Sequence, residues 1–151
     1  MATLQAGDLV PAFTATADTG DTVTADEVRG HRYILYFYPK DNTPGCTLEA
    51  RAFRDAAADF AAAGYTIYGV SRDSTESHCR FREKQQLNFR LWSDLDGEMC
   101  EVFGVVRRIG GVRAGIRRST FVVDETGCII RAYYDVKAST HVAQLRQDLE
   151  I

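Results

Sequence analysis

The stretch Arg32–Tyr38, RYILYFY, decides the fold class of this chain. After the first residue it contains only aromatic and large aliphatic side chains, and no polar residue alternates with them. A strand that is covered on both faces, as in the centre of a helix-flanked sheet, has this pattern. Pro39 follows directly, and proline ends a strand because it lacks the N–H that the ladder needs. We therefore predict an α/β protein built around this buried strand.

Outward from this strand, the pattern predicts one domain over residues 1–151, without a repeat or a linker. Toward the N-terminus, Phe13–Ala17 and Asp21–Ala25 alternate around a turn-like cluster and predict a β-hairpin. Toward the C-terminus we expect helices at Cys46–Ala63, Asp73–Gln86, Glu98–Phe103 and Thr140–Leu149, and strands at Tyr65–Val70, Leu91–Trp92, Ser119–Val123 and Cys128–Tyr134. Together these elements predict a central mixed sheet flanked by helices on both faces.

The composition excludes several classes of function. Hydrophobic residues make up 45% of the 151 residues and the formal net charge is −3, which is typical of a globular protein without a basic surface for nucleic acid. The N-terminal sequence lacks the basic flank and long apolar run of a signal peptide. No segment reaches the roughly 20 apolar residues that a membrane span requires. We therefore expect a cytoplasmic protein without nucleic-acid or membrane partners.

The cysteines suggest either redox chemistry or inert burial. There are four of them: Cys46, Cys79, Cys100 and Cys128. In a reducing compartment, cysteines are more often free, catalytic or metal-bound than disulfide-bonded. They form no Cys-x-x-Cys pair, and the histidines have no ligand-type spacing to them; these are His31, His78 and His141. We therefore expect no metal and no cofactor, although a zinc site assembled by residues distant in sequence stays open.

Cys46 is the candidate nucleophile. It lies where the buried strand passes into a helix, and the free N–H groups of a first helical turn stabilise a thiolate. A simpler interpretation is that Cys46, seven residues before Phe53 and so on the same helix face, only fills the core. Thr43 favours the reactive interpretation, because its hydroxyl can accept from a thiol and donate to a peroxide oxygen. Pro39 and Pro44 also favour it, since they stiffen the loop.

The pattern Pro39-x-x-x-Thr43-x-x-Cys46 is similar to the active-site pattern of peroxiredoxins. The wider string Tyr36–Ala50, YFYPKDNTPGCTLEA, resembles the subgroup called peroxiredoxin Q or bacterioferritin comigratory protein. The resemblance extends along nearly the whole chain, through GVSRDS at 69–74, ESH at 76–78, LWSD at 91–94 and GIRRSTF at 115–121. The chain is therefore identified as a member of this family.

The resemblance implies a thioredoxin-like fold with an N-terminal β-hairpin extension. Cys46 would be the peroxidatic cysteine, which becomes a sulfenic acid, and Thr43 and Arg118 would orient the peroxide and stabilise the thiolate. Glu49, one turn after Cys46, would pair with Arg118 and hold it in place. Without the resemblance, the residues also allow a simpler interpretation, in which Arg118 is a solvated charge at a strand edge and Glu49 is a surface glutamate.

The chain departs from many relatives at the second step of the reaction. Arg51 occupies the position where they carry the resolving cysteine. Other members of the subgroup place the resolving thiol on the later helix, where Cys79 lies, and we favour Cys79 for this role. Cys100 is an alternative with flanking glutamates that disfavour a thiolate, and Cys128 is expected to pack passively in a β run. A one-cysteine mechanism, in which an external thiol attacks the sulfenic acid of Cys46, stays open.

We therefore predict a thioredoxin-dependent peroxidase that reduces hydrogen peroxide and organic hydroperoxides. Its reductant would be thioredoxin or a similar thiol, and the resemblance implies a monomer. A general thiol–disulfide oxidoreductase would require a Cys-x-x-Cys motif, and a cysteine hydrolase would require a recognisable histidine base. A redox-responsive binding or chaperone-like module on the same fold is the alternative from another class of function.

Overall fold

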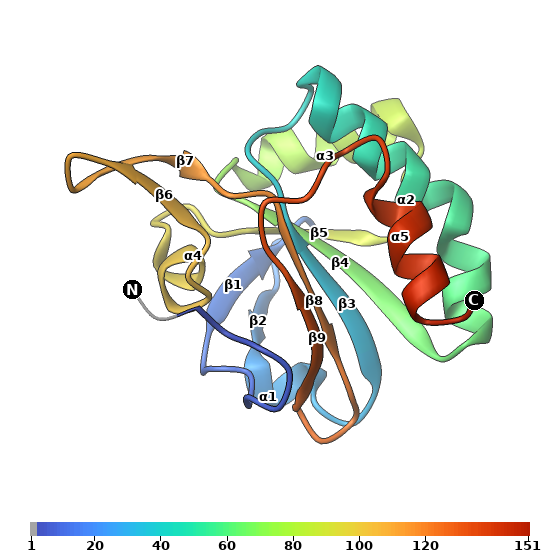
Figure 1. Ribbon diagram of the computed structural model, residues 1–151. Helices are drawn as coiled ribbons and strands as arrows, with labels where there is room; N and C mark the ends of the chain where they lie inside the picture. The colour runs from blue at the N-terminus through green and yellow to red at the C-terminus, as the bar shows by residue number, and fades with distance from the viewer. Residues whose placement is uncertain (1–2) are drawn as a thin grey trace.

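A seven-stranded mixed sheet forms the centre of the protein, in the strand order β2-β1-β5-β4-β3-β8-β9 (Figure 1). The structure, a computed structural model, describes residues 3–151. The strands of this sheet are β1 (Thr14–Ala17), β2 (Thr22–Thr24), β3 (Arg32–Phe37), β4 (Tyr65–Ser71), β5 (Arg90–Ser93), β8 (Ser119–Val123) and β9 (Ile129–Tyr133). The helices are α1 (Ala25–Val28), α2 (Pro44–Ala62), α3 (Thr75–Gln85), α4 (Glu98–Val102) and α5 (His141–Asp148). The predicted architecture, a mixed sheet flanked by helices, is confirmed.

The central strand β3 is buried on both faces, as its sequence predicts. It pairs in parallel with β4 and antiparallel with β8. Its side chains alternate between two separate cores, so that Leu35 and Phe37 belong to one and Ile34 and Tyr36 to the other. Each of these four side chains is at most 1% exposed. The strand therefore fixes the position of the loop that follows it, where the candidate nucleophile lies.

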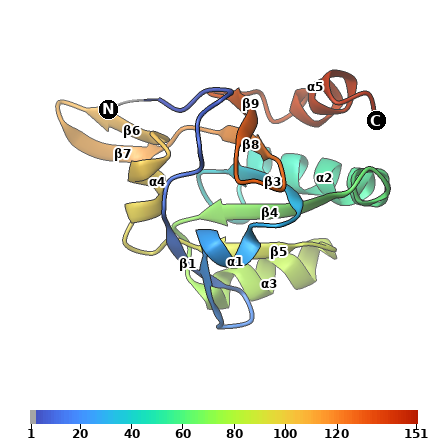
Figure 2. The same ribbon diagram turned by 90° about the horizontal axis from the view of Figure 1, so that it is seen from below.

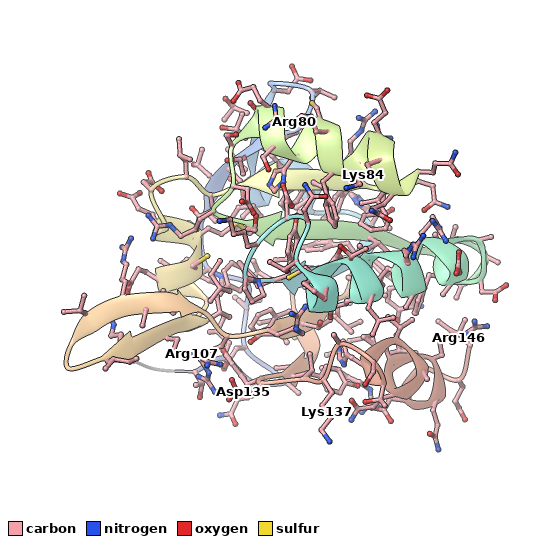
Figure 3. The ribbon with its side chains drawn as sticks, turned by 90° about the horizontal axis from the view of Figure 1, so that it is seen from above. Arg80, Lys84, Arg107, Asp135, Lys137 and Arg146 are labelled. Carbon is pink, nitrogen blue, oxygen red and sulfur yellow. The ribbon has the colours of Figure 1, made fainter. Side chains whose placement is uncertain are left out.

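Three helices cover one face of the sheet, and Figure 3 shows α3, α2 and α5 side by side on this face. The apolar stripe of α2 packs against β3, and the ring of Phe53 stacks on Tyr36 with centroids 4.3 Å apart. Helix α2 begins at Pro44 rather than at the predicted Cys46, with Thr43 as the N-cap residue. Proline is favoured in a first helical turn because the N–H that it lacks has no partner there. Cys46 is accordingly the third residue of the helix.

The opposite face is covered by α1, α4 and the N-terminal segment (Figure 2). The predicted N-terminal hairpin is confirmed as β1–β2, and it extends the main sheet because β1 pairs antiparallel with β5. No helix within residues 3–151 is long and apolar enough to cross a membrane.

A second hairpin, which was not predicted from the sequence, is formed by β6 (Val106–Ile109) and β7 (Val112–Ile116) and extends away from the body of the protein (Figure 1). Its turn is Gly110-Gly111, and both residues have positive φ, 59° and 81°. Two glycines between short β-prone runs are a hairpin signal. The strands were missed because their exposed arginines interrupt the apolar alternation.

Candidate active site

The end of β3 and the first turn of α2 hold Cys46 at the edge of the sheet. The connecting loop begins with Tyr38, whose N–H donates to the Val70 carbonyl on β4. The loop then ends at the N-cap Thr43, and Cys46 lies in the first turn, 1% exposed. The N-terminal turn of a helix favours a negative charge. The position of Cys46 is therefore suited to a thiolate, as the sequence predicts.

Arg118 connects Cys46 to Glu49. Its Nη2 lies 3.4 Å from Cys46 Sγ, and its Nη1 donates to Glu49 Oε1 at 2.7 Å. Cys46 and Glu49 are three residues apart and so lie on one face of α2. Arg118 directly precedes β8, and Ser119 at the start of that strand is paired with Phe37 at the end of β3. The pairing of β8 with β3 thus brings Arg118 to the start of α2.

Glu49 is fully buried, and one of its oxygens, Oε2, has no hydrogen-bond partner. Burial raises the pKa of Glu49 to about 7, although Arg118 works against this shift. Burial by itself would lower the pKa of the Arg118 guanidinium. The electrostatic attraction and hydrogen bonds of Glu49 and Cys46 are larger together, so the pKa is raised. The positive charge beside Cys46 Sγ is therefore retained at every physiological pH.

Three residues of the loop and of the first helical turn lie close to Cys46 in the sequence. The hydroxyl of Thr43 donates to the Lys40 carbonyl at 2.9 Å, which leaves the lone pairs of its oxygen available to accept a hydrogen bond. The expected donation from Thr43 to a peroxide oxygen would require this hydroxyl to turn away from the Lys40 carbonyl. Pro39 is exposed and follows the last strand pair of β3 by two residues. A side chain at Gly45 would meet the Arg118 guanidinium, because a Cβ there would lie 3.1 Å from Nη2.

All four cysteines are free, and the other three have environments different from that of Cys46. Cys79 is exposed on α3, and its thiol donates to the Asp18 carbonyl at 3.0 Å. Cys100 is fully buried in the core on the opposite face of the sheet, and burial raises its pKa far above the ordinary range. Cys128 is half-buried and lies just before β9 rather than inside it, because its N–H donates to the Asp124 side chain in the turn.

A polar cluster that was not predicted from the sequence lies beside the site. The loop after β3, the loop after β4 and helix α3 bring together Asp41, Asp73 and His78, whose possible ligand atoms lie within 4.8 Å of one another. No spacing in the sequence indicates this cluster, since it forms only when the two loops meet at one sheet edge. Each of these atoms already takes part in hydrogen bonds with protein groups. We therefore interpret the cluster as a hydrogen-bonded network.

Comparisons with known proteins identify the family of the chain. The AhpC/TSA family matches residues 6–132 of the chain. Peroxiredoxin Bcp of Bacillus subtilis (strain 168) is 41% identical over 151 residues, which covers 98% of this chain and 96% of that protein. A mutant of peroxiredoxin Q from Xylella fastidiosa superposes with a TM-score of 0.91 at 33% identity, over 99% of this chain and 98% of that one. The bacterioferritin comigratory protein of Xanthomonas campestris, in structures that concern alkyl peroxide reduction, gives a TM-score of 0.84 at 37% identity, over 91% and 90% of the two chains.

The sequence comparisons and the structural comparisons identify the same family, and it is the family that the pattern from Pro39 to Cys46 resembles. The fold is the thioredoxin-like fold of those neighbours. The chain therefore belongs to the AhpC/TSA family, and it is a peroxiredoxin of the Bcp and Q type, an enzyme that reduces peroxides with a cysteine thiol.

Proposed function

We propose that Cys46 is the peroxidatic cysteine of this peroxidase. Its thiolate attacks the distal oxygen of a peroxide R–O–OH, so that an S–O bond forms and the O–O bond breaks. One proton completes the step, which yields the sulfenic acid of Cys46 and the alcohol ROH, or water when the peroxide is hydrogen peroxide. The observation that carries this proposal is the contact of Arg118 Nη2 with Cys46 Sγ in the first turn of α2.

Arg118 and Thr43 have complementary roles toward the peroxide. The guanidinium stabilises the thiolate before the attack and the negative charge that develops on the leaving oxygen during it. The Thr43 oxygen accepts a hydrogen bond from the peroxide O–H, because its own hydrogen is engaged with the Lys40 carbonyl. Glu49 keeps Arg118 in place through the 2.7 Å hydrogen bond, and Pro39 fixes the start of the loop. Peroxides with small organic groups are included as substrates, as the X. campestris structures suggest.

We further propose that Cys79 resolves the sulfenic acid. Attack of the Cys79 thiol forms a disulfide with Cys46 and releases water. A disulfide requires Cα atoms within about 7 Å and thiols that point toward each other. In this structure the Cys79 thiol instead donates to the Asp18 carbonyl on the β1–β2 turn. The first turn of α2 and the start of α3 therefore move before the two sulfurs meet. Thioredoxin or a similar dithiol then reduces the disulfide at the exposed Cys79.

Two cysteine variants test the proposal. Cys46→Ser is expected to abolish consumption of hydrogen peroxide, with Cys100→Ser as a matched control that keeps it. Cys79→Ser is expected to form the sulfenic acid and to lose both the intramolecular disulfide and thioredoxin-driven turnover. Mass spectrometry after one equivalent of peroxide identifies the linked pair. Turnover retained by Cys79→Ser with an external thiol would instead favour the one-cysteine mechanism.

We also propose that residues 1–151 act as a monomeric, single-domain enzyme in the cytoplasm. Arg118 of the same chain contacts both Cys46 Sγ and Glu49, and the family resemblance implies a monomer. The four cysteines are free, which suits a reducing compartment. Analytical ultracentrifugation of the reduced and oxidised protein tests the monomer, and a stable dimer in both states would contradict it.

A further inference from the structure

A buried contact between Asp41 and His78 links the active-site loop to α3. Asp41 Oδ2 lies 2.8 Å from His78 Nδ1 and also accepts from the Ser77 hydroxyl at 2.8 Å. Its other oxygen accepts from the Tyr38 hydroxyl at 2.6 Å. Asp41 is 5% exposed and His78 is fully buried. The loop between β3 and α2 is therefore attached to the first turns of α3 through one carboxylate.

Both ring nitrogens of His78 have a partner. Nε2 lies 3.0 Å from the Trp92 carbonyl, and Nδ1 lies 2.8 Å from Asp41 Oδ2. One partner in the second contact is a carboxylate, and hydrogen bonds to an ionised group are about twice as strong as neutral ones.

The pair joins the two segments whose movement the proposed disulfide requires. Asp41 lies two residues before Thr43 and five before Cys46, and His78 directly precedes Cys79. Asp41 is also held from the side of β4, because its N–H donates to Asp73 Oδ2 at 2.9 Å. Neither Asp41 nor His78 contacts Cys46 Sγ, so the chemistry of the first step makes no use of them.

We propose that the Asp41–His78 pair is a latch that holds the loop of Cys46 against α3, and that its opening sets the rate at which Cys79 reaches the sulfenic acid. This inference rests on the proposed role of Cys79. Resolution follows Cys46–SOH + HS–Cys79 → disulfide + water, and it competes with Cys46–SOH + ROOH → Cys46–SO₂H + ROH. The latch therefore determines how much enzyme is lost as sulfinic acid at a given peroxide concentration. Both Asp41 and His78 act as positioning residues.

Asp41→Asn tests the latch, because it keeps the shape of the side chain and removes the charge. Stopped-flow fluorescence of the single tryptophan, Trp92, separates the peroxide-dependent first step from the later disulfide step. We expect a first-step rate constant within twofold of the wild type. Disulfide formation should be about tenfold faster, which corresponds to about 1.4 kcal/mol. Intact-mass measurement should show about tenfold less sulfinic acid at a fixed peroxide excess.

Ser77→Ala is a milder second variant, since it removes one donor to Asp41 and leaves His78 in place. We expect a change of about threefold in the same direction. The matched control is His31→Gln, which removes a 3.1 Å contact with Tyr68 just before β3, away from the site. It should change neither step. An unchanged disulfide step in Asp41→Asn and Ser77→Ala overturns the latch, as does a tenfold slower first step with the second step unaltered.

Two further measurements separate the latch from the role of Cys79. Peptide mapping of oxidised wild-type protein shows whether Cys46 is linked to Cys79. If it is not, the resolving role of Cys79 fails, and amide hydrogen exchange of residues 75–85 in the reduced protein still tests the latch. Exchange about tenfold faster in Asp41→Asn supports the latch, and unchanged exchange overturns it. If the linkage is present, an unchanged disulfide step refutes the latch alone.

Discussion

Replacing Glu49 with glutamine is expected to remove the pH dependence that this residue gives to stability. Glu49 has no exposed surface, and burial raises its pKa from 4.5 to about 7. Between these two values the folded protein binds a proton at Glu49 that the unfolded chain releases. The contribution of Glu49 to stability is therefore complete below pH 4.5 and is lost as the pH rises through 7. Glutamine is neutral throughout this range and keeps an acceptor for Arg118.

The expected magnitude follows from the size of the shift. One pKa unit corresponds to about 1.4 kcal/mol, so a rise from 4.5 to about 7 corresponds to about 3 kcal/mol of unfolding free energy. His141 acts in the opposite direction, because burial lowers its pKa from 6.5 to about 4 and its contribution is lost as the pH falls between these values. His141 is present in both proteins, and its contribution cancels when the variant is compared with the wild type.

Urea unfolding of both proteins at intervals from pH 4.5 to 8 measures the effect. The free energy of unfolding of Glu49→Gln minus that of the wild type should rise by about 3 kcal/mol over this range. Glu83→Gln, at an exposed position on α3, is the matched control and should give a flat difference. A flat difference for Glu49→Gln as well would show that Glu49 is ionised throughout and would refute the reasoning from burial.

Three further substitutions test the site and the core. Arg118→Lys should lower the rate constant of the first step about a hundredfold in stopped-flow assays, because one ammonium cannot contact both Cys46 Sγ and Glu49. A loss of only about tenfold would contradict the proposed role of the two guanidinium nitrogens. Gly45→Ala should slow the same step about tenfold by displacing the guanidinium that lies 3.1 Å from the new Cβ, and full activity would show that Arg118 tolerates the shift. Phe53→Ala should cost about 4 kcal/mol of unfolding free energy in urea titrations, since the ring is fully buried, and a loss below 1 kcal/mol would show that the core collapses around the gap.

The sequence predicted those features that depend on local pattern. The buried strand β3, the helix that follows it and the N-terminal hairpin were predicted because apolar periodicity and turn residues are local signals. The position of Cys46 in a first helical turn was found for the same reason. The contact of the Arg118 guanidinium with Cys46 was expected only from the family resemblance, because no local signal relates this arginine to a cysteine 72 residues away.

Features that depend on the meeting of distant loops could not be predicted in this way. Asp41 reads as an ordinary loop aspartate, and His78 as one polar residue of a solvated helix. Only the pairing of β3 with β4 places their connecting loops at one edge, where a single carboxylate takes three hydrogen bonds. The Thr43 hydroxyl was expected to donate to a peroxide because the sequence does not show that the Lys40 carbonyl lies 2.9 Å from its oxygen and accepts its hydrogen.

The burial of Cys46 makes the site a size filter. Its sulfur belongs to a residue that is only 1% exposed, whereas Cys79 is exposed. Electrophiles larger than a peroxide group, such as haloacetamides and maleimides, should therefore label Cys79 first although a thiolate at Cys46 is the stronger nucleophile. Under the proposed mechanism, an enzyme labelled at Cys79 can still reduce one peroxide at Cys46. It cannot then form the disulfide that thioredoxin reduces, so it does not begin a second cycle. The buried nucleophile thus makes a bulky thiol reagent an inhibitor of recycling rather than of peroxide reduction.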